Sequence, residues 1–168
     1  HAERIDVARV IRQRFGIDAA AQALRHRFHV GDLALNNLRQ GADLSDIKGK
    51  LVLQGQGGNY RVRQHTGSVQ ASIANGRLEV REVLAPTGFP TNERLVTLDE
   101  LRDARTNLSN INGSLLVKAT RSRIEAEGIN GDIQITSNGE PIKLNRCSGT
   151  IQVEAENASV TANDLRGT

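Results

Sequence analysis

The sequence predicts an all-β fold, a parallel β-solenoid (β-helix) with 18-residue coils of two short strands, about seven coils and an N-terminal helical cap. Three observations carry this prediction. Glycines recur every 18 residues, at 31, 49 and 67 and again at 113, 131, 149 and 167. Apolar residues keep the same phase between these glycines. Of the 168 residues, 38% are hydrophobic but only 2% are aromatic, which favours a thin aliphatic core over a bulky one.

The first arm of each coil is expected to begin two residues after the glycine. Its first inward positions are Leu33, Leu51, Val69, Leu115, Ile133 and Ile151, and its second are Leu35, Leu53, Ala71, Val117, Ile135 and Val153. The third inward column, which is small or polar in most coils, holds Asn37, Gly55, Ile73, Ala119, Ser137 and Ala155. This period of two is typical of a strand with one buried face.

The second arm begins eleven residues after the glycine and repeats the alternation. Its inward columns are Ala42, Tyr60, Leu78, Ile124, Ile142 and Val160, then Leu44, Val62, Val80, Ala126, Leu144 and Ala162, then Ile47, His65, Val83, Ile129, Cys147 and Leu165. Turns rich in Gly, Asn, Ser and Asp join the arms. Equivalent arms run in the same direction, so we expect parallel ladders about 4.8 Å apart and a thin, flattened cross-section.

One coil is interrupted. Gly67 and Gly113 lie 46 residues apart, which is two coils of 18 plus ten extra residues. The second arm of the interrupted coil is still recognisable, so the excess precedes it. Segment 85–95 holds two of the three prolines and predicts an inserted loop. A strand is expected to resume at Val96 and Leu98, followed by the short polar stretch DELRDAR.

Loops on a rigid repeat scaffold commonly carry recognition. In this loop Phe89 stands between a glycine and Pro90, and Arg94 follows shortly afterwards. We interpret Phe89, Pro90 and Arg94 as the candidate partner contact. The alternative is an inert insertion in which Phe89 folds back to cover the sheet.

Residues 1–30 form the expected N-terminal cap, ahead of the solenoid at 31–168. The helical spacing runs through Val7, Ala8, Ile11 and Phe15, then Ile17, Ala20, Ala21, Leu24 and Phe28. Such a cap would cover the open ladder of the first coil. The segment holds six arginines against three acids, which accounts for the net charge of +3. The alternative role is therefore docking on an acidic partner, a membrane surface or nucleic acid through a candidate basic face of Arg4, Arg9, Arg12 and Arg25.

The chain carries no recognisable catalytic constellation. His65 and Cys147 fall in an inward column, where a satisfied imidazole and a small buried thiol are expected. Phosphate-binding loops, serine elbows and metal-ligand spacings of Cys and His do not occur. We expect a protein that is not an enzyme, with no cofactor and no metal. No apolar run approaches the roughly 20 residues of a membrane span, and no base-reading module suggests nucleic acid.

The last two units, NGDIQITSNGEPIKLNRCSG (130–149) and SGTIQVEAENASVTANDLRG (148–167), share one pattern. A glycine is followed by Asp or Thr, Ile, any residue, and Ile or Val, and a second apolar pair follows nine residues later. Over residues 31–168 the chain resembles the bacterial adhesin-like repeat family with its toast-rack-like β-strand domain. The resemblance implies an extracytoplasmic protein of the periplasm, cell envelope or secreted fraction, without catalytic residues.

We expect a bacterial envelope or surface scaffold that binds a protein or surface polymer, or that self-assembles into a homo-oligomer or filament by end-to-end stacking. One alternative is a cytoskeletal filament subunit similar to bactofilins, which are also stacked β-helices. A second alternative is a carbohydrate-binding or carbohydrate-processing β-helix. The processing form would need exposed acids beside aromatic sugar platforms, and the chain has one tyrosine and no tryptophan.

Overall fold

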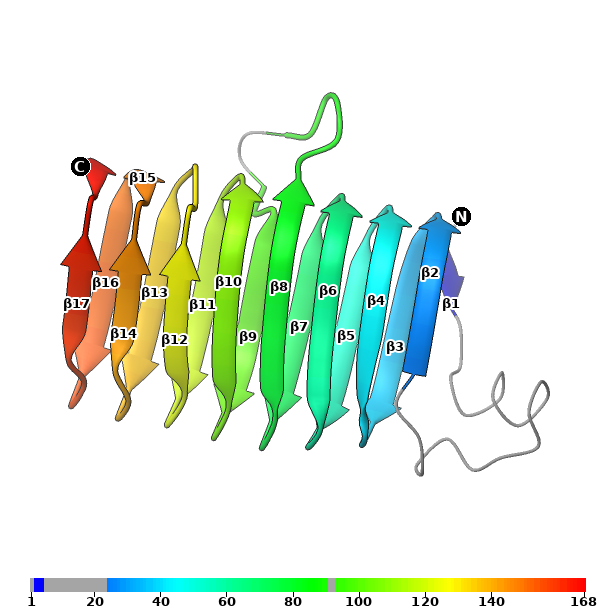
Figure 1. Cartoon of the computed structure of the whole chain (residues 1–168), viewed down its shortest axis with the longest axis horizontal. Coiled ribbons are helices and arrows are strands. Elements are labelled where there is room, and N and C mark those ends of the chain that lie inside the picture. Colours follow the sequence, from blue (N-terminus) through cyan, green and yellow to red (C-terminus); the bar gives the residue numbers. More distant parts are fainter. Residues whose placement is uncertain (1, 5–23, 91–92) are drawn as a thin grey trace.

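The computed structural model describes residues 2–4, 24–90 and 93–168, which form an all-β parallel solenoid of about seven turns with 18 residues in a regular turn (Figure 1). Within these ranges, 18 strands make two sheets of eight strands and one of two. The same ranges contain no helix that is long and apolar enough to cross a bilayer. The predicted parallel β-solenoid with 18-residue coils of two strands is confirmed.

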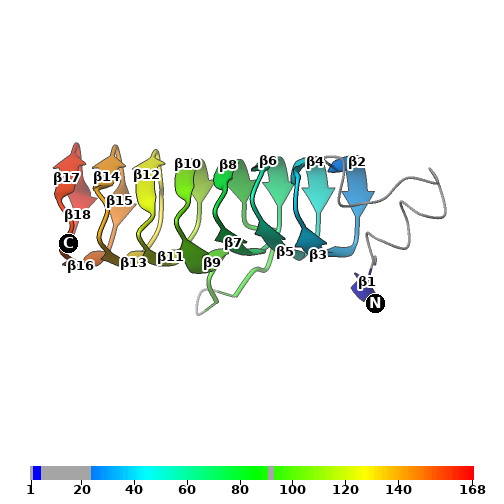
Figure 2. The same ribbon diagram turned by 90° about the horizontal axis from the view of Figure 1, so that it is seen from below.

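Each coil contributes one strand to each large sheet, and the two sheets face each other along the solenoid (Figure 2). Sheet A is β1 (Ala2–Arg4), β3 (Asp32–Leu38), β5 (Leu51–Gln56), β7 (Val69–Ala74), β9 (Val96–Arg102), β11 (Leu115–Thr120), β13 (Ile133–Asn138) and β16 (Ile151–Glu156). Sheet B is β2 (Leu24–Val30), β4 (Gly41–Lys48), β6 (Asn59–Thr66), β8 (Arg77–Leu84), β10 (Arg105–Asn112), β12 (Arg123–Glu127), β14 (Ile142–Asn145) and β17 (Val160–Asn163). The small sheet pairs β15 (Ser148–Gly149) with β18 (Arg166–Gly167).

The strands stack in the register that the repeat predicts. Ile133 pairs with Ile151 in parallel, and the same offset of 18 joins β5 to β7 and β12 to β14. Apolar side chains from both sheets fill the space between them as one continuous cluster, and most of them are fully buried. The stacking of equivalent aliphatic residues is therefore what holds the coils together.

Left-handed backbone recurs once per coil in the second arm, directly before the last inward position. The φ angle lies between 50° and 58° at Asp46, Gln64, Glu82, Asn110, Arg146 and Asp164. This residue separates the main part of the second arm from its end. In the last coils the residues beyond it form the separate ladder of β15 and β18.

The ten extra residues divide between two places. Val96 pairs with Val69, an offset nine residues longer than a regular coil, and these nine residues belong to the loop at 85–95. At the other end of β9, Arg102 pairs with Ala74, an offset ten residues longer. The tenth residue therefore lies within β9, where Glu100 has a φ of 58°. β9 begins at Val96, and the polar stretch DELRDAR begins inside this strand instead of following it.

The third inward position of the first coil was predicted wrongly. Leu38, not Asn37, pairs with Gly55, because the register shifts between Leu35 and Leu38. Asn37 takes a left-handed φ of 60° and is exposed, whereas Leu38 is buried. The extra residue lets β3 bury a leucine where strict counting placed a polar amide.

The prediction of helix at Leu24 and Phe28 is also wrong. Residues 24–30 are strand β2, which pairs with β4 through Leu24 opposite Ala42 and His26 opposite Leu44. The spacing of Leu24 and Phe28 fits a helix locally, but the 18-residue register places this segment as the second arm of a coil. Ala2–Arg4 is likewise a strand, paired with β3. The helical prediction for residues 7–21 lies outside the described residues.

Candidate functional site

The inserted loop leaves the solenoid after β8 and returns at β9 (Figure 1). Phe89 is half-buried and packs against the core cluster, as in the alternative reading of the loop, while Pro90 is exposed. Arg94 reaches across the outer face of sheet A, and its Nη2 donates a hydrogen bond to Oε1 of Gln134 at 3.1 Å. Phe89 and Arg94 thus both hold the loop against the solenoid. A contact role for Phe89, Pro90 and Arg94 remains a prediction.

The two described residues of the candidate basic face lie in different sheets. Arg4 lies in β1 of sheet A, and Arg25 lies in β2 of sheet B, where it pairs with Asp43. Arg25 is exposed. Arg9 and Arg12 lie outside the described residues.

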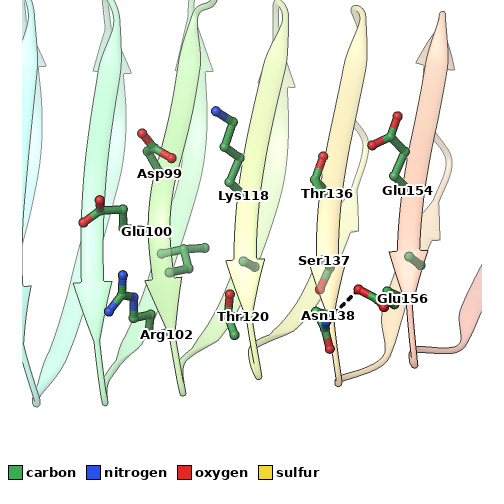
Figure 3. Close-up of a pocket in the computed structure, with 13 residues that line it drawn as sticks. Asp99, Glu100, Arg102, Lys118, Thr120, Thr136, Ser137, Asn138, Glu154 and Glu156 are labelled. Atoms are coloured by element: carbon green, nitrogen blue, oxygen red, sulfur yellow. Dashed lines mark hydrogen bonds between the residues drawn. The ribbon is translucent and has the colours of Figure 1, made fainter.

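A shallow groove of about 620 Å³ crosses the outer face of sheet A (Figure 3). One row of side chains along it is Asp99, Lys118, Thr136 and Glu154, and a second row is Arg102, Thr120, Asn138 and Glu156. Nδ2 of Asn138 donates a hydrogen bond to Oε2 of Glu156 at 2.9 Å. Acids outnumber bases along this groove, which we call the sheet-A groove.

A second groove, of about 700 Å³, lies at the corner where sheet A turns into sheet B between β7 and β12. Its side chains include Arg77, Arg105, Arg121 and Arg123, which we call the arginine corner. Asp103 lies among them, and Nε and Nη2 of Arg121 bind its two carboxylate oxygens at 2.7 and 2.8 Å. This hydrogen bonding holds the pKa of Asp103 below its ordinary value.

The outer face of sheet B is charge-compensated. Arg63 pairs with Asp43 at 2.8 Å, and Glu79 binds Arg81 at 2.6 Å and lies 3.8 Å from Arg61. These exposed pairs contribute little to stability individually. They leave sheet B without a strong local charge over these strands, in contrast to the arginine corner.

No family model, curated protein or solved structure matches this chain. The likeness to the adhesin-like repeat family therefore rests on the repeat pattern of the sequence. What the structure adds is the parallel β-solenoid itself.

His65 and Cys147 lie in the core and line neither groove. His65 is fully buried in an inward column, and its Nε2 lies 3.2 Å from the carbonyl oxygen of Ser68. Cys147 is buried, as predicted, near backbone carbonyl oxygens. Across residues 2–4, 24–90 and 93–168, no three His, Cys, Asp or Glu side chains are grouped so that they could hold a metal ion.

Burial of His65 predicts a pH-dependent stability. Desolvation lowers the pKa of the imidazole below its ordinary value of 6.5, although a hydrogen bond to Ser68 opposes this shift. Below that value the unfolded chain binds more protons at this position than the folded chain. The free energy of unfolding should therefore be fully present above pH 6.5 and fall as the pH is lowered through 6.5 toward the folded-state pKa.

Urea unfolding at about pH 7.5 and about pH 5.5 measures this effect. The matched variant is His65→Val, because Val83 occupies the adjacent position in the same column. The variant should lose less stability than the native chain between the two pH values. An equal loss in both proteins would contradict the assignment to His65.

The arginine corner was not predicted from the sequence. Arg105 and Arg123 are 18 residues apart, but Arg77 and Arg105 are 28 apart because the ten-residue insertion separates them. The sequence signal that could have revealed it is the 18-residue spacing of these arginines, which appears once the ten inserted residues are left out of the count. All three arginines then follow a small residue at the same point of the coil, namely Gly76, Ala104 or Ser122.

Proposed function

We propose that the protein is a non-catalytic scaffold of the bacterial cell envelope or surface, which binds a macromolecular partner along the outside of its solenoid. The observation that carries the proposal is the distribution of side chains. The interior is a closed aliphatic column, whereas the charged groups stand in rows on the outer faces and at the corner. A stack of this kind offers a long surface with a fixed repeat.

The grooves support binding of an extended partner over turnover of a small substrate. Both are open and shallow, and they run across several strands of neighbouring coils. Enzyme sites for small molecules are typically concave and partly desolvated, with polar groups that converge on one point. The buried titratable side chains His65, Tyr60 and Cys147 lie instead in the packed core.

Co-sedimentation with purified peptidoglycan sacculi tests the proposal, and the loop provides the variant. We expect saturable binding by the native chain and weaker binding by Phe89→Ala. Because Phe89 is only half-buried, its replacement should cost about 1 to 2 kcal/mol of stability. Val30→Ala is the matched control, since Val30 is an exposed apolar residue on β2, far from the loop.

One outcome would count against this function, and another would count against the contact role of Phe89. Absence of binding to sacculi by the native chain would contradict an envelope role. A stability loss of about 3 kcal/mol or more in Phe89→Ala with unchanged binding would show that this side chain only packs. Electron micrographs of the same sample test the bactofilin-like alternative, which requires filaments.

A further inference from the structure

Three arginines stack directly above one another at the arginine corner. Arg105 pairs with Arg77 on one side and with Arg123 on the other, in parallel register. Backbone hydrogen bonds fix these rungs: the N–H of Arg105 donates to the carbonyl of Gly76, and that of Arg123 to the carbonyl of Ala104, both at 3.0 Å. Neighbouring strands are about 4.8 Å apart, so the Cα atoms of the three arginines lie in a row at about that spacing.

This stack is not neutralised within the described part of the chain. Arg77, Arg105 and Arg123 are exposed, and none has a carboxylate within ion-pairing distance there. The nearby carboxylate of Asp103 is occupied by both nitrogens of Arg121. Like charges directly opposite each other on neighbouring strands are destabilising. A row of three such charges therefore favours an external anion.

The groove beside the stack has room for such an anion. Glycine at 58 and 76 and alanine at 104 keep its floor free of large side chains, and Glu140 is the one acid beside Asp103 in its lining. The groove crosses several coils and is open to solvent. A guanidinium group presents a planar fork of donors that matches a carboxylate or phosphate in bidentate geometry.

We propose that the arginine corner binds a linear anionic polysaccharide, with its carboxylates lying against Arg77, Arg105 and Arg123. This inference deepens the proposed function, on which it rests, by naming the class of partner. The proposed function places the chain among surface polymers, and the carboxylates of an acidic polysaccharide match the guanidinium fork in bidentate geometry.

The aromatic content of the surface points the same way. Single-stranded nucleic acid is usually held by stacking of bases on exposed aromatic rings. Of the aromatic side chains that the structure describes, Tyr60 is fully buried and Phe89 packs against the core. We expect recognition at this corner to be by charge.

Isothermal titration with polygalacturonate oligomers at low salt tests the site. The triple variant R77Q/R105Q/R123Q should bind about tenfold or more weakly than the native chain, because charge-assisted hydrogen bonds are lost. The slope of log affinity against log salt concentration should fall by about two. The matched control is R61Q/R63Q/R81Q, which removes the same charge from sheet B and should bind like the native chain.

Further probes separate this site from general charge attraction. Galacturonic acid monomer and neutral dextran should not bind measurably. Equal weakening in both triple variants would overturn the proposal, as would binding of short duplex DNA or polyphosphate as tight as that of polygalacturonate. Thermal unfolding of R77Q/R105Q/R123Q should show no loss of stability, since the substituted side chains are exposed and like-charged.

The same variants distinguish failure of this inference from failure of the proposed function. If the native chain and R77Q/R105Q/R123Q sediment equally with sacculi and neither binds polygalacturonate, the polysaccharide site is wrong and the scaffold function stands. If the native chain does not bind sacculi at all, the envelope function fails by its own test.

Discussion

Replacing Gly67 by alanine is expected to destabilise the protein by about 4 kcal/mol or more. Gly67 has a φ of 132°, a conformation that residues with a side chain rarely adopt. A Cβ atom at this position would also lie 2.1 Å from the carbonyl oxygen of Gly49 in the preceding coil. Neither the backbone of Gly67 nor that of Gly49 can shift without breaking the ladder on both sides.

Urea unfolding of Gly67→Ala and Gly88→Ala separates the two causes. Gly88 also has a positive φ, 80°, but nothing lies within 4 Å of its Cβ position in the loop. Gly88→Ala should therefore cost about 1 to 2 kcal/mol, from the backbone conformation alone. If the two variants lost the same stability, close approach of stacked glycines would not be the reason for the repeat.

This close approach explains why the fold was readable from the sequence. Gly131 and Gly149 repeat the geometry of Gly67, with Cβ positions 2.3 and 2.4 Å from a carbonyl oxygen of the preceding coil. Because only glycine can occupy this corner, glycine recurs in the sequence with the period of the coil. The alternating aliphatic residues then assign both arms, because a shift of one residue would move every apolar side chain to the outside.

Other features leave no comparable signal. The left-handed residue in each second arm is Gln64 in one coil, Glu82 in the next and Arg146 later, so that no residue type marks it. The extra residue in β3 has the same character, and strict counting placed Asn37 where Leu38 lies. Both conformations are imposed by the packing of the surrounding ladders, which outweighs the local preference of these residues.

The candidate surfaces were predicted only in part. The prolines of residues 85–95 revealed the loop, but the half-buried position of Phe89 depends on the core beneath it and has no local signature. The arginine corner depends on residues that are brought together from different coils, and the insertion changes their spacing in the sequence. Surfaces assembled in this way are visible only once the exact register is known.

The second large effect is expected where one coil departs from the repeat. Gly55 shares its inward column with Leu38 and Ile73, yet it has no side chain to fill the space. The ring of Tyr60, from sheet B, occupies that space instead, since a Cβ on Gly55 would lie 2.1 Å from its Oη. Tyr60 is fully buried, and its hydroxyl donates a hydrogen bond to the carbonyl of Leu38 at 3.0 Å. Burial raises the pKa of this hydroxyl to about 12.

Tyr60→Ala should therefore cost about 4 kcal/mol, because it empties a cavity in the middle of the column and removes a buried hydrogen bond. Gly55→Ile alone should cost about 3 kcal/mol, since the new side chain collides with the ring. The double variant G55I/Y60A places an aliphatic side chain where Ile73 has one in the next coil. It should be more stable than the sum of the two losses predicts, by about 2 kcal/mol.

Urea unfolding of the four proteins in this cycle measures the coupling. Tyr60→Ala combined with Ile133→Val is the control, because β13 lies several coils away from Tyr60 and the two losses should add. Additive losses in G55I/Y60A as well would mean that Tyr60 does not substitute for the missing side chain. Coupling confined to G55I/Y60A would show that the side chain filling a layer of the core can come from either sheet A or sheet B, as long as each coil fills its own layer.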